Sequence, residues 1–312
     1  MKLISFVTPC YNEGRNLPLL VDEIINVVKV HLESYDFEII LVNDGSEDDT
    51  WKVILELSKK YVFVKGIDLS RNFGHQIALT AGLESAMGDV VIYFDSDLQH
   101  PPSVFPLMIE KWQEGFKIVH TLRVSTEGET WFKKFFSELF YNFVNLLSDT
   151  KINKGMADFK LLDRQVLDEL NKLKEHNRFL RGLVPWLGFK STIINYTARE
   201  RIFGKPFYNF RRNITFAKTG ILSFSVKPLK YIGYLGVFIT FISLIILCFG
   251  VIISILNNKL IFSPTFFSTL ILILFNGVLM SALGIISLYL AYVYQEVIGR
   301  TLYIIRKKTN DK

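Results

Sequence analysis

Short apolar runs alternate with amphipathic segments along the first 122 residues of the chain. The apolar runs are rich in β-branched and aromatic residues and end in polar turns, which predicts strands over residues 3–7, 37–42, 62–67, 90–94 and 118–122. Between them, apolar positions at helical spacing predict helices over residues 17–28, from 47 to about 57, over 75–87 and from 101 to 112, with Asn16 as the first N-cap. This alternation predicts an α/β domain built on a mostly parallel, doubly wound sheet.

Two long uncharged stretches follow in the last third of the chain. Residues 231–256 and 260–295 contain no Asp, Glu, Lys or Arg. Because about 20 apolar residues span a bilayer, we expect two transmembrane helices, over about 232–256 and 267–292. Basic residues lie before the first stretch and after the second, whereas Lys259 is the only charge between them. The positive-inside rule therefore predicts a hairpin with both flanks in the cytoplasm.

These patterns divide the chain into four parts. We expect a cytoplasmic catalytic domain over residues 1–210, a basic juxtamembrane segment over 211–230, the hairpin over 231–295 and a basic cytoplasmic tail over 296–312. The N-terminal apolar stretch is too short for a signal peptide. A multi-pass protein of the inner (cytoplasmic) membrane is expected, with its catalytic domain and both termini in the cytoplasm. Residues 131–147 carry one broad apolar face, which fits either a core helix or an interfacial helix.

The amino-acid composition limits the classes of binding partner that we expect. The formal net charge of +6 is compatible with nucleic acid, anionic lipid or phosphorylated substrates. The sequence contains no RNA-binding motif, zinc-ligand spacing or long Lys/Arg tract, so no nucleic-acid partner is expected. Cys10 and Cys248 are far apart, and the second lies in an apolar stretch, so no disulfide framework is indicated.

Two carboxylates follow the strand predicted over residues 90–94. Asp95 and Asp97 are one residue apart, and Gln99 comes after them. Ligands of open α/β sheets bind beyond the carboxyl ends of the strands. Oxygen ligands there suit Mg²⁺ or Mn²⁺, which take one or two carboxylates and complete their coordination with water and substrate phosphates. An isolated Asp-x-Asp pair is as typical of a turn, but its place at the end of an apolar strand favours a metal site.

Six short motifs occur in order along the chain: Pro9-Cys10-Tyr11-Asn12-Glu13, Asn43-Asp44-Gly45-Ser46, Asn72-Phe73-Gly74-His75-Gln76, Asp95-Ser96-Asp97-Leu98-Gln99, Gly155-Met156-Ala157-Asp158-Phe159 and Arg178-Phe179-Leu180-Arg181-Gly182. With the two apolar stretches, this set resembles the polyprenyl-phosphate glycosyltransferases of glycosyltransferase family 2. In pattern it is similar to the bactoprenol (undecaprenyl-phosphate) glucosyltransferases and to dolichol-phosphate mannose synthase. The resemblance covers nearly the whole chain.

The resemblance implies a GT-A fold, which is Rossmann-like with a mostly parallel sheet. It implies an inverting enzyme that uses Mg²⁺ or Mn²⁺ to transfer a sugar from a nucleotide-sugar to undecaprenyl or another polyprenyl phosphate at the cytoplasmic membrane face. We expect glucose and a UDP-sugar donor. The lipid-linked product would serve cell-surface glycan or lipopolysaccharide modification. Relatives of this kind also suggest a homo-oligomer, with a tetramer as one possible form.

The resemblance also implies roles for individual residues. Those expected at the nucleotide-sugar are Pro9, Tyr11, Asn12, Glu13, Asp44 and Asp95. Those expected at the metal are Asp95, Asp97 and Gln99. The catalytic positions are Asp158, which matches the usual candidate base, and Asp97. Those expected near the donor or acceptor phosphates are Arg123, Arg181, Arg201 and Lys205.

The sequence departs from the family pattern at two places. His100 stands where an acidic residue is common, and Gly204-Lys205-Pro206-Phe207-Tyr208 matches the motif Gly-x-Ser/Thr-Lys-Tyr only approximately. Simpler explanations exist for several candidates. Asp44 can cap a turn, Glu13 can be a first-turn acid favoured by the helix dipole, and Asp158 can be a loop residue in a tight turn beside a strand. His75, His100 and His120 show no metal-ligand spacing and are interpreted as structural.

The proposed acceptor limits what a catalytic base can contribute. A phosphate monoester has a second pKa near ~6, so at neutral pH it is already mostly dianionic. Our hypothesis is that Asp158 orients the acceptor or the sugar rather than removing a proton.

Other functions stay open from sequence alone. A processive polysaccharide synthase would need a Gln-x-x-Arg-Trp motif and more spans, and neither is found. The sugar could be N-acetylgalactosamine, mannose or aminoarabinose, and the lipid could be of another kind, such as diacylglycerol. A non-catalytic membrane scaffold that only binds a nucleotide is the remaining alternative, against which the presence of Asp95, Asp97 and Asp158 argues.

Overall fold

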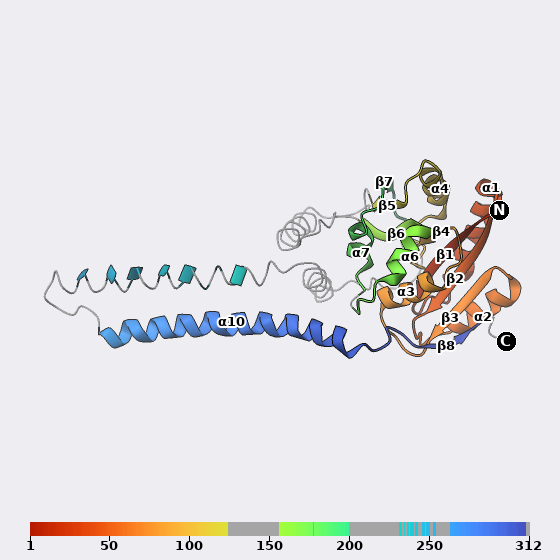
Figure 1. The fold of residues 1–312 in the computed structure, drawn as a ribbon. Coiled ribbons are helices and arrows are strands. Elements are labelled where there is room, and N and C mark those ends of the chain that lie inside the picture. The colour runs from red at the N-terminus through yellow and green to blue at the C-terminus, as the bar shows by residue number, and fades with distance from the viewer. Residues whose placement is uncertain are drawn as a thin grey trace.

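The computed structural model describes residues 1–123, 156–176, 178–199 and 263–309, together with scattered helical positions between 231 and 253. The expected helix over 131–147 and two of the expected phosphate ligands, Arg201 and Lys205, lie outside the described residues. Within this part, an eight-stranded sheet forms the centre, in the order β7-β5-β6-β4-β1-β2-β3-β8 (Figure 1).

Four neighbouring strands form the parallel half of the sheet. They are β1 (Lys2–Cys10), β2 (Tyr35–Asn43), β3 (Val64–Leu69) and β4 (Val90–Tyr93). The sequence predicted each of them, and β3 begins two residues later than expected because Val62 is exposed to solvent. Since these strands run in one direction, the polar turns that follow β1, β2 and β4 meet at one edge of the sheet. We call this edge the polar edge.

The other half of the sheet contains an antiparallel strand. β6 (Met156–Asp163) lies between β4 and β5 (Ile118–Arg123) and runs against both, while β7 (Ser191–Tyr196) lies outside β5 and parallel to it. Tyr93 of β4 faces Lys160 of β6 in the register. The first residues of β6 therefore lie beside the residues that follow β4.

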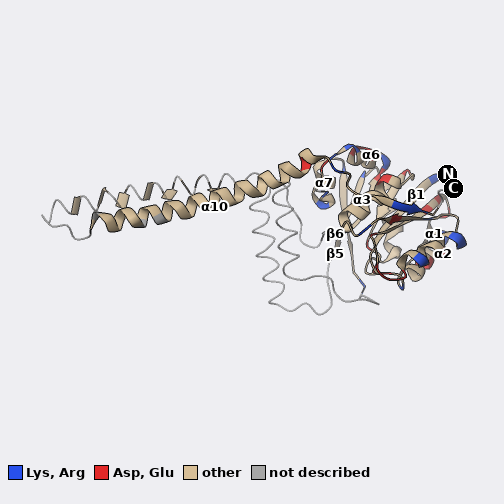
Figure 2. Ribbon diagram, turned by 90° about the horizontal axis from the view of Figure 1, so that it is seen from below, with Lys and Arg blue, Asp and Glu red and all other residues tan. Residues whose placement is uncertain are grey.

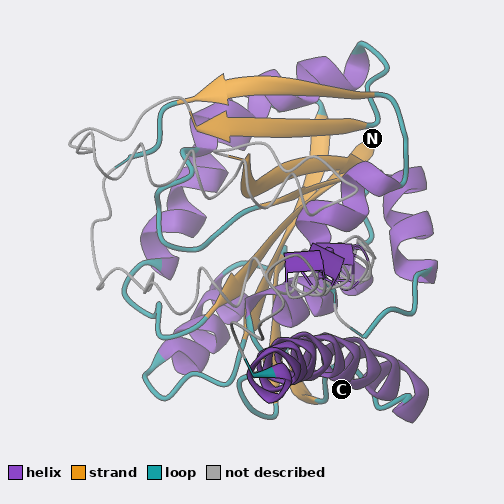
Figure 3. Cartoon of the chain, turned by 90° about the vertical axis from the view of Figure 1, so that its left-hand side faces the viewer, coloured by secondary structure: helices purple, strands orange, loops and turns teal. Residues whose placement is uncertain are grey.

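Helices cover both faces of the sheet (Figure 3). One face is covered by α1 (Leu17–His31), α2 (Thr50–Lys60) and α4 (Phe105–Gln113), which follows a 3-10 turn over Pro102–Val104. The other face is covered by α3 (His75–Ser85), α6 (Arg164–Lys172) and α7 (Leu180–Trp186). In α1 the buried residues recur every three or four positions, as the sequence pattern predicts. Asn16 is the N-cap residue of α1, but its side chain donates to Glu13 instead of accepting from the helix.

One long apolar helix projects from the sheet domain. Among the residues that the structure describes, α10 (Pro264–Ile298) is the one helix long and apolar enough to cross a membrane. Its single charged residue is Glu296, and Figure 2 shows the helix as almost entirely free of charged residues. It contains the second expected span. Described positions between 231 and 253 are helical, and a Cβ placed on Gly236 would lie 3.9 Å from Val278 Cγ1 of α10.

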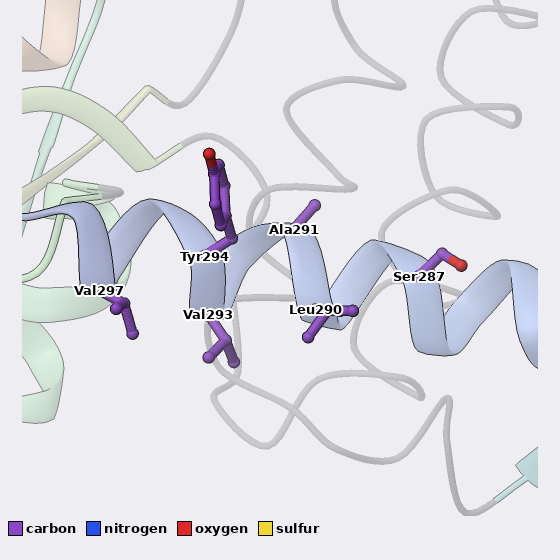
Figure 4. Close-up of a pocket in the computed structure, with 6 residues that line it drawn as sticks. All are labelled: Ser287, Leu290, Ala291, Val293, Tyr294 and Val297. Carbon is purple, nitrogen blue, oxygen red and sulfur yellow. The ribbon is translucent and has the colours of Figure 1, made fainter.

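Among the described residues, a hollow beside α10 is lined by six residues of that helix, namely Ser287, Leu290, Ala291, Val293, Tyr294 and Val297 (Figure 4). The side chains of Val293 and Val297 point to one side of the helix and that of Tyr294 to another. Four of the six lining side chains are purely apolar, and those of Ser287 and Tyr294 carry only a hydroxyl group. The hollow therefore lies on the flank of an apolar helix.

After α10 the chain returns to the sheet. α10 ends at Gly299, which adopts a left-handed φ of +62°, and β8 (Ile305–Lys308) then pairs antiparallel with β3. Only a basic tail was expected here, because Ile305-Arg306-Lys307-Lys308 has no apolar alternation. What holds β8 is an ion pair and backbone pairing: Arg306 Nε donates to Asp68 Oδ2 at 2.7 Å.

Replacing Arg306 with Ala should destabilise the sheet domain, although Arg306 follows the long apolar helix in the sequence. Asp68 is completely buried and would keep only the amide of Asn43, which donates to it at 2.7 Å. Since Arg306 is half exposed, we expect a loss of about 1–3 kcal/mol rather than the full cost of breaking a buried ion pair. Denaturant unfolding of the purified full chain measures it. Lys307→Ala, an exposed neighbour, is the control; equal losses in both variants would contradict the explanation.

Candidate active site

The turns after β1 and β2 are joined by side-chain hydrogen bonds at the polar edge. The backbone N–H of Asn12 donates to Ser46 Oγ at 3.0 Å, and Asn12 Oδ1 accepts from the N–H of Glu47 at 2.9 Å. Asn12 adopts a left-handed φ of +57°, which Asn tolerates better than most residues. On the other side, the carbonyl of Pro9 accepts from Ser96 Oγ at 3.0 Å. The turn that carries Pro9, Tyr11 and Asn12 is therefore held between those that follow β2 and β4.

Asp44 holds the turn that precedes α3. Its two carboxylate oxygens accept from the backbone N–H groups of Phe73 at 2.7 Å and Gly74 at 3.0 Å. Burial raises the pKa of Asp44, and these two donors act against that effect. Gly45 has a φ of +64°, and a Cβ there would collide with the backbone of Arg71 and Asn72. Asp44 therefore fixes the turn that leads into α3, and it caps neither α2 nor α3, because Phe73 and Gly74 precede the first residue of α3.

Glu13 lies in the turn before α1 at the same edge. Its carboxylate accepts from the side-chain amide of Asn16, and its backbone N–H donates to Thr50 Oγ1 at 3.0 Å. The residue therefore links the starts of α1 and α2. The expectation of a first-turn acid was wrong, because α1 begins at Leu17 and has no acidic residue in its first turn.

The turn after β4 is built around a buried leucine. Leu98 has a left-handed φ of +63° although it is not glycine, and its side chain is buried in the core. Such a conformation costs roughly 1–3 kcal/mol, and burial of the side chain offsets it. The carboxylate of Asp97 accepts from the backbone N–H of Gln99 at 3.1 Å. The Asp-x-Asp pair is thus part of a tight turn whose oxygen atoms gather at the polar edge.

Two histidines contact the carboxylate of Asp95. His75 Nε2 lies 2.6 Å from Asp95 Oδ1, and His100 Nε2 lies 3.2 Å from Oδ2. Burial alone would raise the pKa of Asp95, but the two rings hold it well below its usual range. Both histidines were expected to be structural, because their spacing in the sequence is not that of metal ligands. The one available signal was the motif that contains His75 and Gln76, to which no role was assigned.

Asp158 lies inside strand β6 and not in a turn, so that sequence expectation was wrong. Its side chain is buried, and it accepts from Gln76 Nε2 at 3.0 Å and from Arg181 Nε at 2.9 Å. Burial alone would raise the pKa of Asp158, but the Arg181 guanidinium holds it below its usual range. His75 and Gln76, the first residues of α3, therefore connect Asp95 with Asp158.

Three buried polar side chains lie in a row on the neighbouring strands β4, β6 and β5, near Asp158. Tyr93, Lys160 and His120 face one another across β4, β6 and β5, and all three are buried. Among the described residues, Tyr93 Oη, Lys160 Nζ and His120 Nδ1 have no hydrogen-bond partner. Burial lowers the pKa of Lys160 to about 8 and that of His120 to about 3. Asp158 is the anion that favours the charged form of Lys160.

Arg123 ends β5 at the polar edge, opposite Tyr196 of β7. Its Nε atom is buried and lacks a partner within residues 1–123, 156–176 and 178–199. Arg181 contacts Asp158, as described above. The structure thus brings two of the expected phosphate ligands to the same edge as the carboxylates.

The carboxylates at this edge offer oxygen atoms to a cation. In the described part of the chain, no group of three or more His, Cys, Asp or Glu side chains is arranged to hold a metal ion. Mg²⁺ and Mn²⁺ do not need such a group, since they use one or two carboxylates together with water and phosphate oxygens. Asp95, whose side chain is 35% exposed, and its neighbour Asp97 fit that requirement.

Comparison with known proteins gives consistent matches. The family described as glycosyl transferase family 2 matches residues 5–170. The chain is 39% identical over 305 residues to the uncharacterized glycosyltransferase YkcC of Bacillus subtilis (strain 168), covering 97% of this chain and 93% of that protein. It is 35% identical to the SfII prophage-derived bactoprenol glucosyl transferase of Shigella flexneri, covering 97% of each. Among solved structures, the mannosyltransferase PcManGT from Pyrobaculum calidifontis, in complex with GDP-Man and Mn²⁺, aligns with a TM-score of 0.47 at 15% identity, covering 70% of this chain and 63% of that one.

The matched segment begins in β1 and ends in α6, so it contains the turns after β1, β2 and β4 and the start of β6. Asp44, Asp95 and Asp158 all lie within it. The full-length matches extend the similarity to the apolar helix and to β8. The chain is therefore a glycosyltransferase with a GT-A, Rossmann-like fold, and it belongs to glycosyl transferase family 2.

Proposed function

We propose that this enzyme transfers a sugar, with inversion, from a nucleotide-sugar to a polyprenyl phosphate at the cytoplasmic face of the membrane. The observation that carries the proposal is the connection of Asp95 to Asp158 through His75 and Gln76, in a domain from which a helix long and apolar enough to cross a membrane projects. Relatives named bactoprenol glucosyl transferases, similar over nearly the whole chain, support the lipid acceptor and glucose. A UDP-sugar is the donor we expect.

The donor side is assigned to the turns after β1, β2 and β4. Pro9, Tyr11, Asn12, Glu13 and Asp44 would contact the nucleoside, and Asp95 the sugar nucleotide beside it. Asp95, Asp97 and Gln99 would hold Mg²⁺ or Mn²⁺, which supplies positive charge to a leaving nucleoside diphosphate. The low pKa of Asp95 keeps its carboxylate ionised and available for that purpose at neutral pH.

The acceptor side is assigned to Asp158 and the nearby arginines. Each oxygen of Asp158 already accepts a hydrogen bond, and its lowered pKa makes it a weak base. The acceptor phosphate gains little from a base, since its second pKa is near ~6. We therefore assign Asp158 to orientation. Counter-charge for the donor and acceptor phosphates would come from Arg123, Arg181, Arg201 and Lys205.

The topology of the C-terminal segment supports a membrane arrangement. β8 pairs with β3 of the catalytic domain, and it follows α10 by only a few residues. The C-terminal end of α10 must therefore lie on the same side of the membrane as the catalytic domain. We propose a multi-pass protein of the cytoplasmic membrane, with both termini and the catalytic domain in the cytoplasm, that assembles as a homo-oligomer.

The test is a transfer assay with the purified full chain in detergent. Undecaprenyl phosphate is offered with UDP-glucose, UDP-N-acetylgalactosamine, UDP-aminoarabinose and GDP-mannose, each with Mn²⁺ and with EDTA, and lipid products are identified by mass spectrometry. We expect a monophosphate-linked glucosyl lipid in the presence of Mn²⁺. A parallel reaction with diacylglycerol checks the acceptor. Transfer to diacylglycerol alone, or nucleotide binding without any transfer, would contradict the proposal.

A further inference from the structure

His100 lies between the carboxylate of Asp95 and the hydroxyl of Tyr196. Its Nε2 is 3.2 Å from Asp95 Oδ2, and its Nδ1 is 2.9 Å from Tyr196 Oη. The three side chains come from the turn after β4 and from the edge strand β7. This contact gives a physical role to the one position in the Asp95–His100 stretch that departs from the family pattern.

The chemistry of the three groups fixes the protons. The carboxylate of Asp95 can only accept, so His100 Nε2 must carry a hydrogen and donate it. The other nitrogen, Nδ1, shares a hydrogen bond with the hydroxyl of Tyr196, which can donate or accept. Tyr196 thus holds one nitrogen of the ring while the other donates to Asp95.

Packing holds the imidazole ring of His100 in place. The His100 side chain is 7% exposed, and its ring centroid lies 5.0 Å from that of Phe159 and 5.7 Å from that of Tyr196. His75, the other histidine on Asp95, is 43% exposed. An exposed ring can move when a ligand arrives, whereas a buried ring with both nitrogens bonded keeps its place. One oxygen of Asp95 therefore has a fixed partner and the other an exchangeable one.

We propose that His100 and Tyr196 are positioning residues for the divalent-cation site: Tyr196 fixes His100, and His100 orients the carboxylate of Asp95 for the metal-bound nucleotide diphosphate. This inference rests on the proposed function, because it requires that Asp95 holds a metal ion. An acidic side chain at position 100 could not replace the histidine in this arrangement, since an ionised carboxylate has no hydrogen to donate.

Two substitutions of similar size separate the two contacts of the ring. The side-chain amide of Gln reaches about as far as Nε2 of histidine, whereas that of Asn reaches only as far as Nδ1. His100→Gln should therefore keep a donor to Asp95, and His100→Asn should keep only the contact with Tyr196. Tyr196→Phe removes the hydroxyl and preserves the aromatic ring. The readout is the affinity of the full chain for Mn²⁺ in the presence of UDP. Electron paramagnetic resonance measures it through the signal of the free ion.

We expect His100→Asn to weaken Mn²⁺ binding by about tenfold, as is usual when a hydrogen bond to a metal-binding side chain is lost. His100→Gln should remain within about threefold of the wild type, and Tyr196→Phe should lie between the two. Both His100 variants disturb the same packing, so a difference in Mn²⁺ affinity between them does not reflect a loss of protein stability. Equal affinities for the two would overturn the positioning role.

Asp97→Asn is the separate check: no Mn²⁺ binding by the wild type, or binding that Asp97→Asn leaves unchanged, would contradict the proposed metal site itself.

Discussion

Replacing Asp97 with Asn is expected to reduce sugar transfer by about 100- to 1000-fold. The proposed reaction expels a nucleoside diphosphate, and its developing charge must be neutralised in a site where Arg123 and Arg181 would serve the phosphates as well. Loss of one proposed metal-binding carboxylate would remove electrostatic stabilisation of the order of 3–4 kcal/mol from the transition state. Asn keeps the size of the side chain and an oxygen that can accept from the N–H of Gln99, so the turn should survive.

The measurement is kcat and KM for the donor at several Mn²⁺ concentrations, with the purified full chain. Asp89→Asn is a matched control, because Asp89 precedes β4 at its opposite end and its carboxylate accepts from the N–H of Leu3. We expect that control to retain activity within about twofold. Full turnover by Asp97→Asn, or a loss that excess Mn²⁺ and the control variant share, would exclude a metal-binding role for Asp97.

The parallel half of the fold could be predicted because its elements carry local signals. Apolar runs such as Val90–Tyr93 end in polar turns, and α1 shows a helical repeat of buried residues. β6 and β8 were not foreseen. β6 is placed by its pairing with β4 and β5, and β8 by the ion pair of Arg306 with Asp68, contacts between residues far apart in sequence. A short charged edge strand has no pattern of its own from which to predict it.

The candidate site, like the fold, could be predicted only in part from the sequence. Its carboxylates follow strand ends or occur in ordered motifs, so sequence pointed to Asp44, Asp95, Asp97 and Asp158. The hydrogen bonds between them could not be predicted from spacing. His75 and His100 are 25 residues apart, and only the fold places both rings on Asp95. Likewise Arg181 was expected at a phosphate, and the structure adds its ion pair with Asp158.

Replacing Asp158 with Asn should lower kcat by about 100-fold without removing a limb from the pH profile. The pKa of Asp158 lies below its usual range, so the carboxylate is ionised throughout the interval between about pH 6 and pH 9. Its removal takes no ionisation of its own away from that interval, and it lowers the pKa of Lys160, whose charged form Asp158 favours. The loss in rate would arise because Arg181 loses its ion-pair partner and buried Lys160 loses the anion that favours its charged form. The pH dependence of kcat for the wild type and the variant is the measurement.

A double-mutant cycle with Arg181→Gln distinguishes orientation from base catalysis. If Asp158 acts by holding Arg181 in place, each single variant disrupts the same pair, and the double variant should lose little more activity than either alone. If Asp158 is instead the base, Arg181→Gln should raise its pKa, because the guanidinium lowers it in the wild type, and should move an acidic limb of the profile toward neutral pH. A limb that shifts in Arg181→Gln and vanishes in Asp158→Asn would refute the orienting role. Parallel profiles with non-additive losses would assign the pair to positioning of a phosphate that is already ionised.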